Sequence, residues 1–229
     1  KGTGNPSESS TIMLRGVTSL MGGFTPLVLV DGIEGSLETV APENIAEISV
    51  LKDASAAAIY GTRGASGVII ITTKSGKRGD RYNVSYSGYG SISNFAKTAD
   101  FMDAEYMRAL GDDLPKYSAF ADLGQDTDWL GLVSQTGWVQ NHNVSLEGGT
   151  QSMTYSANVS YRQNEGVIKG SFANDLRAQM DISQYLFNDI LKVRLNMLKS
   201  ISESDNQESE HIYHQAVTHN PTSPAYTED

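Results

Sequence analysis

The sequence has no cysteine, so a disulfide framework and thiol chemistry are both excluded. It has no run of 18 apolar residues, so a transmembrane helix is excluded as well. No signal peptide is visible, and the polar Gly- and Ser-containing start at Lys1 is typical of an internal segment of a longer chain. Charged residues make up only 19% and hydrophobic residues 39%, so disorder is not predicted.

Basic residues are also scarce, because the net charge is -10 over 229 residues. The acidic residues are concentrated in two places: residues 91–137 hold eight acidic against three basic residues, and residues 202–229 hold six acidic residues and no Lys or Arg. These segments together carry -11, which leaves about +1 for the rest. Such a distribution argues against a nucleic-acid partner.

The chain has two regions that differ in the arrangement of their apolar residues, and residues 1–79 form the first. Short apolar runs at 26–30, 48–51 and 68–73 predict strands, the first ending at the turn Asp31-Gly32. Pro42 is placed to begin one helical turn. An Ala-rich segment, 54–60, predicts a helix that Asp53 caps and that stops at Gly61. Residues 1–79 are therefore expected to form a small α+β unit.

Residues 80–229 instead alternate between apolar and polar side chains, with 22 glycines and 11 tyrosines in the whole chain favouring β structure. Five segments have one apolar and one polar face, as antiparallel strands do. They centre on residues 82–87, 143–147, 153–162, 176–183 and 191–197.

The connections between these segments run long, short, medium, short, long, with a helix expected near 103–110 in the first. Short turns on one side and long loops on the other are typical of an outer-membrane barrel, which would place both acidic segments on the outer face. A soluble β-sandwich also alternates, but strands of about ten residues with aromatic side chains near their ends favour the barrel. Five strands cannot close such a barrel, so further strands are expected outside this sequence.

One ordered set of motifs decides between these alternatives. Residues 26–32 (PLVLVDG) are followed by 48–68 (ISVLKDASAAAIYGTRGASGV) and 69–74 (IIITTK). This set closely resembles the plug domain of SusC/RagA-type TonB-dependent transporters, and residues 12–16 (IMLRG) resemble the plug strand before it. The resemblance continues through residues 128–129, 140–149, 155–170 and 220–226, so it covers nearly the whole chain.

The resemblance implies an α+β plug domain followed by antiparallel transmembrane strands, about five of an expected 22-stranded barrel. Residues 1–79 would be the C-terminal part of the plug and residues 80–229 the first barrel strands and loops. The plug-motif residues, expected to support the plug or its contact with the barrel, are Arg15, Asp31, Gly32, Lys52, Asp53, Tyr60, Gly61, Arg63, Gly64 and Gly67.

The implied function is TonB-dependent import of an oligosaccharide or oligopeptide across the outer membrane of a Gram-negative bacterium. The implied partners are a SusD-like surface lipoprotein, the TonB complex energised by ExbB and ExbD, the ligand and outer-membrane lipid, with no nucleic acid and no cofactor. A β-rich adhesin or glycan-binding structural protein, and a soluble glycan-binding or hydrolytic domain, are the alternatives.

The chemistry of the motif residues can also be interpreted without the resemblance. The spacing of Gly61, Gly64 and Gly67 permits tight backbone turns between helix and strand. Arg63 lies between two of these glycines, where it is expected to pair with carboxylates of the barrel wall. Lys52 and Asp53 sit at a strand-to-helix junction, where ordinary capping and solvation explain them equally well.

No motif for catalysis or metal binding stands out. The three glycines lack the Gly-Lys-Ser/Thr ending of a phosphate loop and follow a helix instead of a strand. His211 and His214 lie in a polar segment, where solvated side chains are the simpler interpretation than a metal site. Neither a Ser-His-Asp order nor a cysteine nucleophile is supported by the sequence, so no enzymatic activity is predicted.

Overall fold

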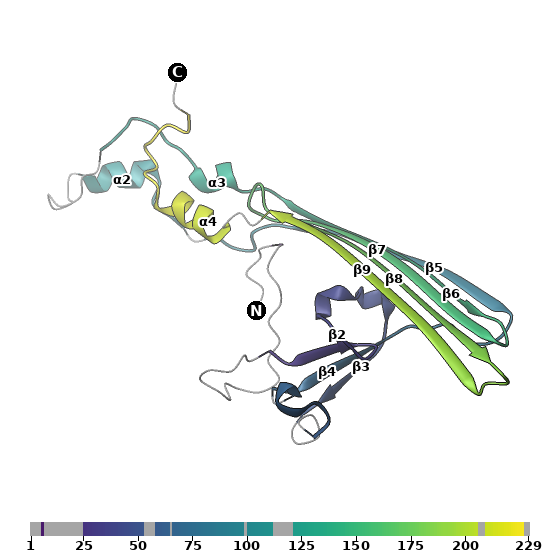
Figure 1. Cartoon of the computed structure of the whole chain (residues 1–229). Helices are drawn as coiled ribbons and strands as arrows, with labels where there is room; N and C mark the ends of the chain where they lie inside the picture. The colour runs from purple at the N-terminus through teal and green to yellow at the C-terminus, as the bar shows by residue number, and fades with distance from the viewer. Residues whose placement is uncertain are drawn as a thin grey trace.

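The structure is a computed structural model, and it describes residues 6, 25–52, 58–64, 66–98, 100–111, 121–205 and 209–226. Two sheets dominate it (Figure 1). A small four-stranded sheet lies against one face of a long five-stranded sheet, and three helices gather at one end of the long sheet. No helix in the described ranges is long and apolar enough to span a membrane.

The small sheet contains β1 (Leu27–Val30), β2 (Ile33–Glu34), β3 (Ile45–Leu51) and β4 (Val68–Thr73), in the order β2-β1-β4-β3. The three predicted apolar runs are therefore confirmed as strands. β1 pairs parallel with β4, while β2 and β3 pair antiparallel with their neighbours. The β-branched run of β4 lies next to the centre of the sheet, where Val68 is buried on one face and Ile69 and Ile71 on the other, as suits a Val/Ile-rich strand.

Each face of the small sheet has its own apolar cluster. Val30, Val40, Ile69 and Ile71 form one, and Leu29 with Val68 forms the other, to which Tyr60 adds its ring. The turn predicted at Pro42 is the 3-10 helix η2 (Pro42–Asn44), with η1 (Leu37–Thr39) before it. Residues 58–60 are helical and lead into η3 (Gly61–Gly64), whereas the rest of the predicted helix, residues 54–57 and its cap Asp53, lies outside the described residues.

The long sheet is a simple meander in which every strand pairs antiparallel with the next. Its strands are β5 (Arg81–Ser93), β6 (Gly137–Gly149), β7 (Met153–Glu165), β8 (Phe172–Leu186) and β9 (Leu191–Asp205). The five alternating segments are confirmed, but the strands run 13 to 15 residues instead of about ten. They are longer because polar residues continue the pairing past the apolar stretch, for example Gln163 opposite Asn174.

This greater strand length shortens the connections. The first turn occupies residues 150–152 instead of beginning at Gly148, and the second occupies residues 187–190 instead of 185–188. In the second turn Phe187, Asn188 and Asp189 all have positive φ, which the sequence did not indicate. The long, short, medium, short, long order is nevertheless confirmed.

The two faces of the long sheet are the reverse of those in a soluble protein. Its buried side chains are polar: Asn141, Asn143, Ser145, Ser156, Asn158, Ser160, Arg177, Gln179, Asp181 and Ser183. Its apolar side chains are exposed on the opposite face, among them Tyr82, Val84, Val144, Val159, Leu195 and Met197. A sheet that exposes its apolar face to water would be unstable, so this face needs an apolar covering.

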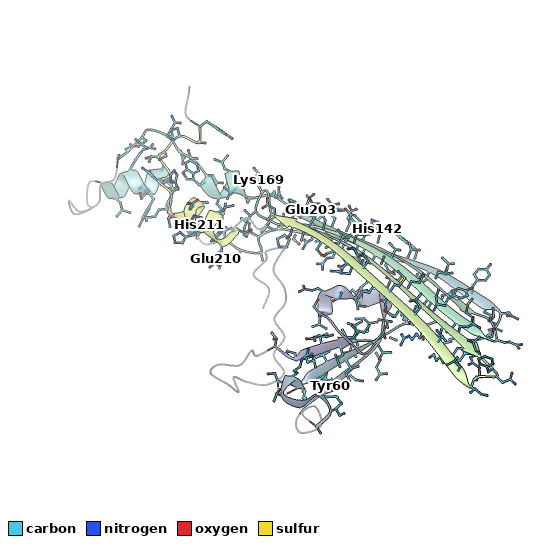
Figure 2. All side chains as sticks on the ribbon, viewed as in Figure 1. Tyr60, His142, Lys169, Glu203, Glu210 and His211 are labelled. Atoms are coloured by element: carbon cyan, nitrogen blue, oxygen red, sulfur yellow. The ribbon has the colours of Figure 1, made fainter. Side chains whose placement is uncertain are left out.

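The long connections meet at one end of the long sheet. They contain α2 (Ala104–Gly111), α3 (Trp129–Val133) and α4 (Ser209–Thr218) (Figure 1). The helix predicted near 103–110 is thereby confirmed, with the Asp103 side chain accepting from the Tyr106 N–H at its start. Figure 2 places Lys169, Glu203, Glu210 and His211 toward this end, and Tyr60 in the part of the chain that holds the small sheet.

Candidate functional site

The contact between the small sheet and the polar face of the long sheet is where plug-motif residues meet distant parts of the chain. Its centre is the two-residue turn between β1 and β2, formed by Asp31 and Gly32. Both have positive φ, +48° and +87°, as the Asp-Gly hairpin turn requires. The turn directs Asp31 away from its own hairpin and toward β4 and the long sheet.

Asp31 is almost fully buried, with 5% of its side chain exposed. It accepts hydrogen bonds from the Thr73 N–H at 3.0 Å and the Thr73 hydroxyl at 2.6 Å, which fix it to β4. Two amides of the long sheet also donate to it, Gln179 on β8 at 3.4 Å and Asn196 on β9 at 3.3 Å. A buried carboxylate with four donors is stable, and here half of the donors belong to the other sheet.

A charge pair completes this cluster. Arg194 on β9 lies 2.6 Å from the Asp181 carboxylate and 3.6 Å from that of Asp31. Asp181 is 3% exposed and also accepts from Asn196. We call the six residues Asp31, Thr73, Gln179, Asp181, Arg194 and Asn196 the Asp31 network. It bonds three elements, β4, β8 and β9, to one carboxylate of the plug motif.

The 3-10 helix η2 makes a second polar contact with the long sheet. The Asn44 side-chain amide donates to Gln179 at 2.7 Å, with both side chains buried. Glu43 accepts from Asn141 on β6 at 2.6 Å through one carboxylate oxygen. Its other oxygen, and Nε of Arg162 opposite Asn141 on β7, are buried without a hydrogen-bond partner. The contact is therefore polar throughout but only partly satisfied, as suits a surface reached by water.

The segment after β4 makes the third contact, at the short-turn end. The Ser156 hydroxyl donates to the Lys74 carbonyl at 3.2 Å, and the Gly79 N–H donates to the Thr150 carbonyl at 3.3 Å. Arg78 donates to both oxygens of Asp189, at 2.7 and 2.8 Å, and lies 3.6 Å above the ring of Tyr185. Hydrogen bonding from Arg78 holds the pKa of Asp189 below its ordinary value.

Gly76 fits this segment against the strands because it has no side chain. A Cβ there would lie 2.7 Å from the Tyr155 backbone nitrogen, and closer still to the carbonyl oxygens of Gly148 and Tyr155. We expect Gly76→Ala to push the segment off the strands and to destabilise the contact by about 1–3 kcal/mol, as overpacking does. The measurement is the rate at which a protease cuts residues 74–79 in the folded full-length receptor, which should rise.

Gly35→Ala is the matched control, since its Cβ would meet neighbours at an ordinary 3.5 Å. If both variants were cut at the wild-type rate, the close approach at Gly76 would not hold the segment in place.

The other plug-motif residues lie within the small sheet or at its edge. Arg63 pairs with Glu34 on β2 instead of with a carboxylate of the long sheet among the described residues, so its expected pairing with the barrel wall stays a prediction. The reason is local: η3 brings Arg63 beside the β1–β2 hairpin, and both side chains remain exposed. The hydrogen bond from Arg63, and the charge of that guanidinium, hold the pKa of Glu34 below its ordinary value.

The plug-motif glycines of η3 and the residues after it allow backbone conformations that other residues rarely adopt. Gly61 and Gly67 have φ of +61° and +95°, and the Gly67 N–H donates to the Gly64 carbonyl at 2.9 Å. Lys52 is exposed just after β3, while Arg15 and Asp53 lie outside the described residues. Among the plug-motif residues that the structure describes, Asp31, positioned by Gly32, forms hydrogen bonds with the long sheet.

The partners of Asp31 on the long sheet were not predicted. Gln179, Arg194 and Asn196 occupy polar positions of alternating segments, as does Asp181, which pairs with Arg194. The alternation was the only signal in the sequence that pointed to them. Chemically the interface offers hydrogen bonds and ion pairs that can break and re-form. Within the described ranges, no three His, Cys, Asp or Glu side chains converge as metal ligands would.

Comparison with known proteins identifies relatives for both parts. The family model of the TonB-dependent receptor plug domain matches residues 2–68. The TonB-dependent receptor SusC of Bacteroides thetaiotaomicron is 34% identical over 99% of this chain, and TonB-dependent receptor P26 of Formosa agariphila is 30% identical over 99%. Each alignment covers 24% of the relative, so the chain spans about a quarter of the length of these proteins.

Solved structures agree with the sequence relatives. The RagAB peptide importer in its open-open state matches 89% of this chain with a TM-score of 0.73 and 26% identity, over 27% of the importer chain. In its closed-closed state it matches 80% with a TM-score of 0.64. The match extends across the small and long sheets alike, since neither sheet alone amounts to four fifths of the chain.

Proposed function

Since this chain belongs to the SusC/RagA-type TonB-dependent receptors, we propose that it contributes plug and barrel wall to a transporter that imports a nutrient across the outer membrane. The family consists of transport proteins, not enzymes, and its members are β-barrel proteins of the outer membrane. Residues 1–79 would belong to the plug and residues 80–229 to the first five strands of a barrel of about 22.

One observation carries this proposal: the long sheet covers a polar plug with its polar face and exposes its apolar face. Lipid is the covering that an apolar outer face needs, and an aqueous lumen is the surrounding that a polar inner face needs. An adhesin or a soluble domain would not require a sheet whose polar face is covered and whose apolar face is exposed. Neither would it require a plug domain bonded to the polar face.

The polar interface also fits the cycle of an energised importer. A neutral contact such as that of Asn44 with the wall contributes about 0.5–1.5 kcal/mol, and a contact of a charged group such as Asp31 or Arg78 about 1.5–3 kcal/mol, because water replaces each bond that is lost. A pull from the periplasm by TonB, energised by ExbB and ExbD, would therefore detach the plug in small steps. An apolar interface of the same area would resist such release more strongly.

The cargo would be an oligosaccharide or an oligopeptide, captured with a SusD-like surface lipoprotein over the barrel mouth. The RagAB relative is by its description a peptide importer, which supports the peptide option.

Deletion of the gene in its native host tests the proposal. We expect the deletion strain to lose growth on one class of nutrient, peptide or glycan, supplied as the sole source, and to regain it when the full-length gene is restored. Restoration in a strain without TonB should fail. Unchanged growth on every peptide and glycan offered, with reduced adherence instead, would contradict the proposal and favour an adhesin.

A further inference from the structure

One row of inward-facing side chains crosses all five strands of the long sheet where the contact with the small sheet and η2 ends. Its members, each directly opposite the next, are Tyr89, Asn141, Arg162, Asp175 and Ser202. Glu43 of η2 bonds to Asn141 in this row. Among the described residues, no hydrogen bond joins residues 25–79 to the sheet between this row and the long connections. The row therefore borders the lumen on the outer side of the plug.

Arg162 is a charged residue of this row that has no partner among the described residues. It is partly buried, and its Nε atom is fully buried without a hydrogen bond. Its terminal nitrogens are accessible and form no hydrogen bond or ion pair to a described residue. A partly buried charge without a partner is unfavourable, and a ligand that pairs with it recovers this cost as binding affinity.

The carboxylates beside Arg162 are already occupied or are closed to a ligand. Asp175, directly opposite on β8, accepts from the Ser202 hydroxyl at 2.6 Å and pairs with Arg177 at 3.2 Å. Glu43 accepts a hydrogen bond at 2.6 Å through one oxygen, and its other oxygen is buried. The charge that this part of the wall offers to the lumen is therefore the guanidinium of Arg162.

A carboxylate is the group that matches this guanidinium best, because it accepts two parallel N–H bonds in one plane. A neutral hydroxyl accepts from the same donors with less gain, since it carries no charge. Tyr89 lies two strands away in the same row, about 10 Å from Arg162 by strand spacing, and is 52% exposed. Its ring offers an apolar face to the carbon skeleton of a ligand that is held at Arg162.

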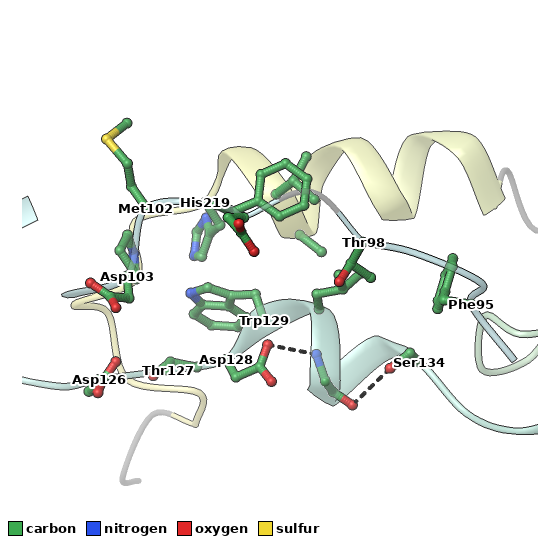
Figure 3. Close-up of a pocket in the computed structure, with 17 residues that line it drawn as sticks. Phe95, Thr98, Met102, Asp103, Asp126, Thr127, Asp128, Trp129, Ser134 and His219 are labelled. Carbon is green, nitrogen blue, oxygen red and sulfur yellow. Dashed lines mark hydrogen bonds between the residues drawn. The ribbon is translucent and has the colours of Figure 1, made fainter. Parts of the chain in front are cut away.

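The pocket between α3 and α4 at the outer end offers a carboxylate no such partner. Four aspartates line it, and no Lys or Arg belongs to its described lining. Figure 3 shows three of them, Asp103, Asp126 and Asp128. Because like charges repel, a ligand that passes this end is expected to direct its carboxylate inward, toward Arg162.

We propose that Arg162 binds a carboxylate group of the imported cargo, at the place where plug, wall and lumen meet. The inference rests on the proposed import function and narrows its cargo to acids, either peptides with a free carboxylate or oligosaccharides with uronic acid residues. The carboxylate accepts from the terminal nitrogens of Arg162, and the rest of the cargo lies along the row toward Tyr89. Because Glu43 reaches the same row, cargo bound there lies against the plug and the wall together.

The test is competitive binding to the purified full-length receptor, read by mass spectrometry of the ligands that it retains. One arm mixes hexapeptides of neutral residues that end in a free carboxylate with the same peptides as amides. The other arm mixes oligogalacturonates with their methyl esters. We expect about ten-fold or greater enrichment of the acid in one arm, the gain expected for charge-assisted hydrogen bonds. The arm that shows it identifies the source of the carboxylate.

Arg162→Gln should lower the ratio of acid to neutral ligand to about one, and Arg162→Lys should keep part of the enrichment, because it retains the charge but not the paired donors. Neither variant removes a bond within the described residues, so the unfolding midpoint should stay at the wild-type value. Arg81→Gln is the matched control, since Arg81 is exposed on the same face at the opposite end of the sheet and should enrich the acid like the wild type.

A ratio of about one in both arms of the wild type, or a wild-type ratio retained by Arg162→Gln, would overturn the carboxylate site. Either result leaves the import proposal intact if the deletion strain still loses growth on a nutrient. A deletion strain that grows normally on every peptide and glycan would overturn import itself, whatever these ratios are.

Discussion

Replacing Asp31 with alanine is expected to loosen the plug from the barrel wall more than any other single change at this interface. The substitution removes the acceptor for the Thr73 hydroxyl and N–H and for the amides of Gln179 and Asn196. Thr73 and Gln179 are 3% and 8% exposed, so their donors would be left unpaired in a buried place. Removing one member of a buried charged network costs about 3–5 kcal/mol.

The measurement is the denaturant midpoint of plug unfolding in the full-length receptor held in detergent, followed by protease sensitivity of residues 25–73. The barrel should keep its heat-modifiable migration, because the wall retains the Arg194–Asp181 pair at 2.6 Å without Asp31. A looser plug should also raise ion leakage through the receptor in planar membranes.

Glu34→Gln is the matched control for Asp31→Ala, since it removes an acidic charge from the same hairpin. Glu34 is 57% exposed and pairs with Arg63 within the small sheet, so its loss should leave the plug docked. Equal midpoints for both variants and the wild type would mean that the Asp31 network does not hold the plug to the wall.

The sequence was sufficient to predict the elements of this interface, but only some of its contacts. Strand positions in both sheets follow from period-two alternation and β-branched runs, signals that each segment carries on its own. The turn at Asp31-Gly32 follows from the preference of Asp-Gly for positive φ. Each of these depends on neighbours in the chain, which is why the sequence reveals them.

Contacts between the sheets depend instead on how two units dock, and no local pattern encodes that. Asp31 and Asn196 are 165 positions apart, and Asn196 looks like any other polar residue of an alternating strand. Arg63 was expected to pair with carboxylates of the barrel wall because it lies between two glycines of the plug motif. Its partner Glu34 lies 29 positions earlier, and only the folded arrangement of β2 and η3 brings the two side chains together. Gly76 likewise has no local sequence feature that distinguishes it from other linker glycines, because the backbone of Gly148 and Tyr155 that it approaches belongs to distant strands.

The second large effect is expected on the opposite face of the long sheet, which the proposed function places in lipid. Leu146 shares its row across the sheet with Ala157, Met180 and Met197. On β8 the apolar face runs from Leu176 to Leu186, interrupted by Gln184, and ten residues of strand extend about 33 Å. A strand tilted by roughly 40° then spans about 25 Å of membrane, with the Leu146 row near its middle.

Leu146→Arg is therefore expected to destabilise the folded receptor in lipid by about 2–4 kcal/mol, the cost of a charge at the centre of the bilayer. Gln140→Arg is the matched control, because Gln140 lies on the same face of the same strand beyond the apolar stretch and should cost about 0–1 kcal/mol. Both variants of the full-length receptor are refolded into vesicles, and their urea midpoints are compared. In a soluble sandwich an exposed Leu146 would tolerate arginine as well as Gln140 does, so equal midpoints would contradict the membrane assignment. A much lower urea midpoint for Leu146→Arg than for Gln140→Arg, together with a loosened plug in Asp31→Ala, would assign the apolar face of the long sheet to lipid and its polar face to the plug and the aqueous lumen.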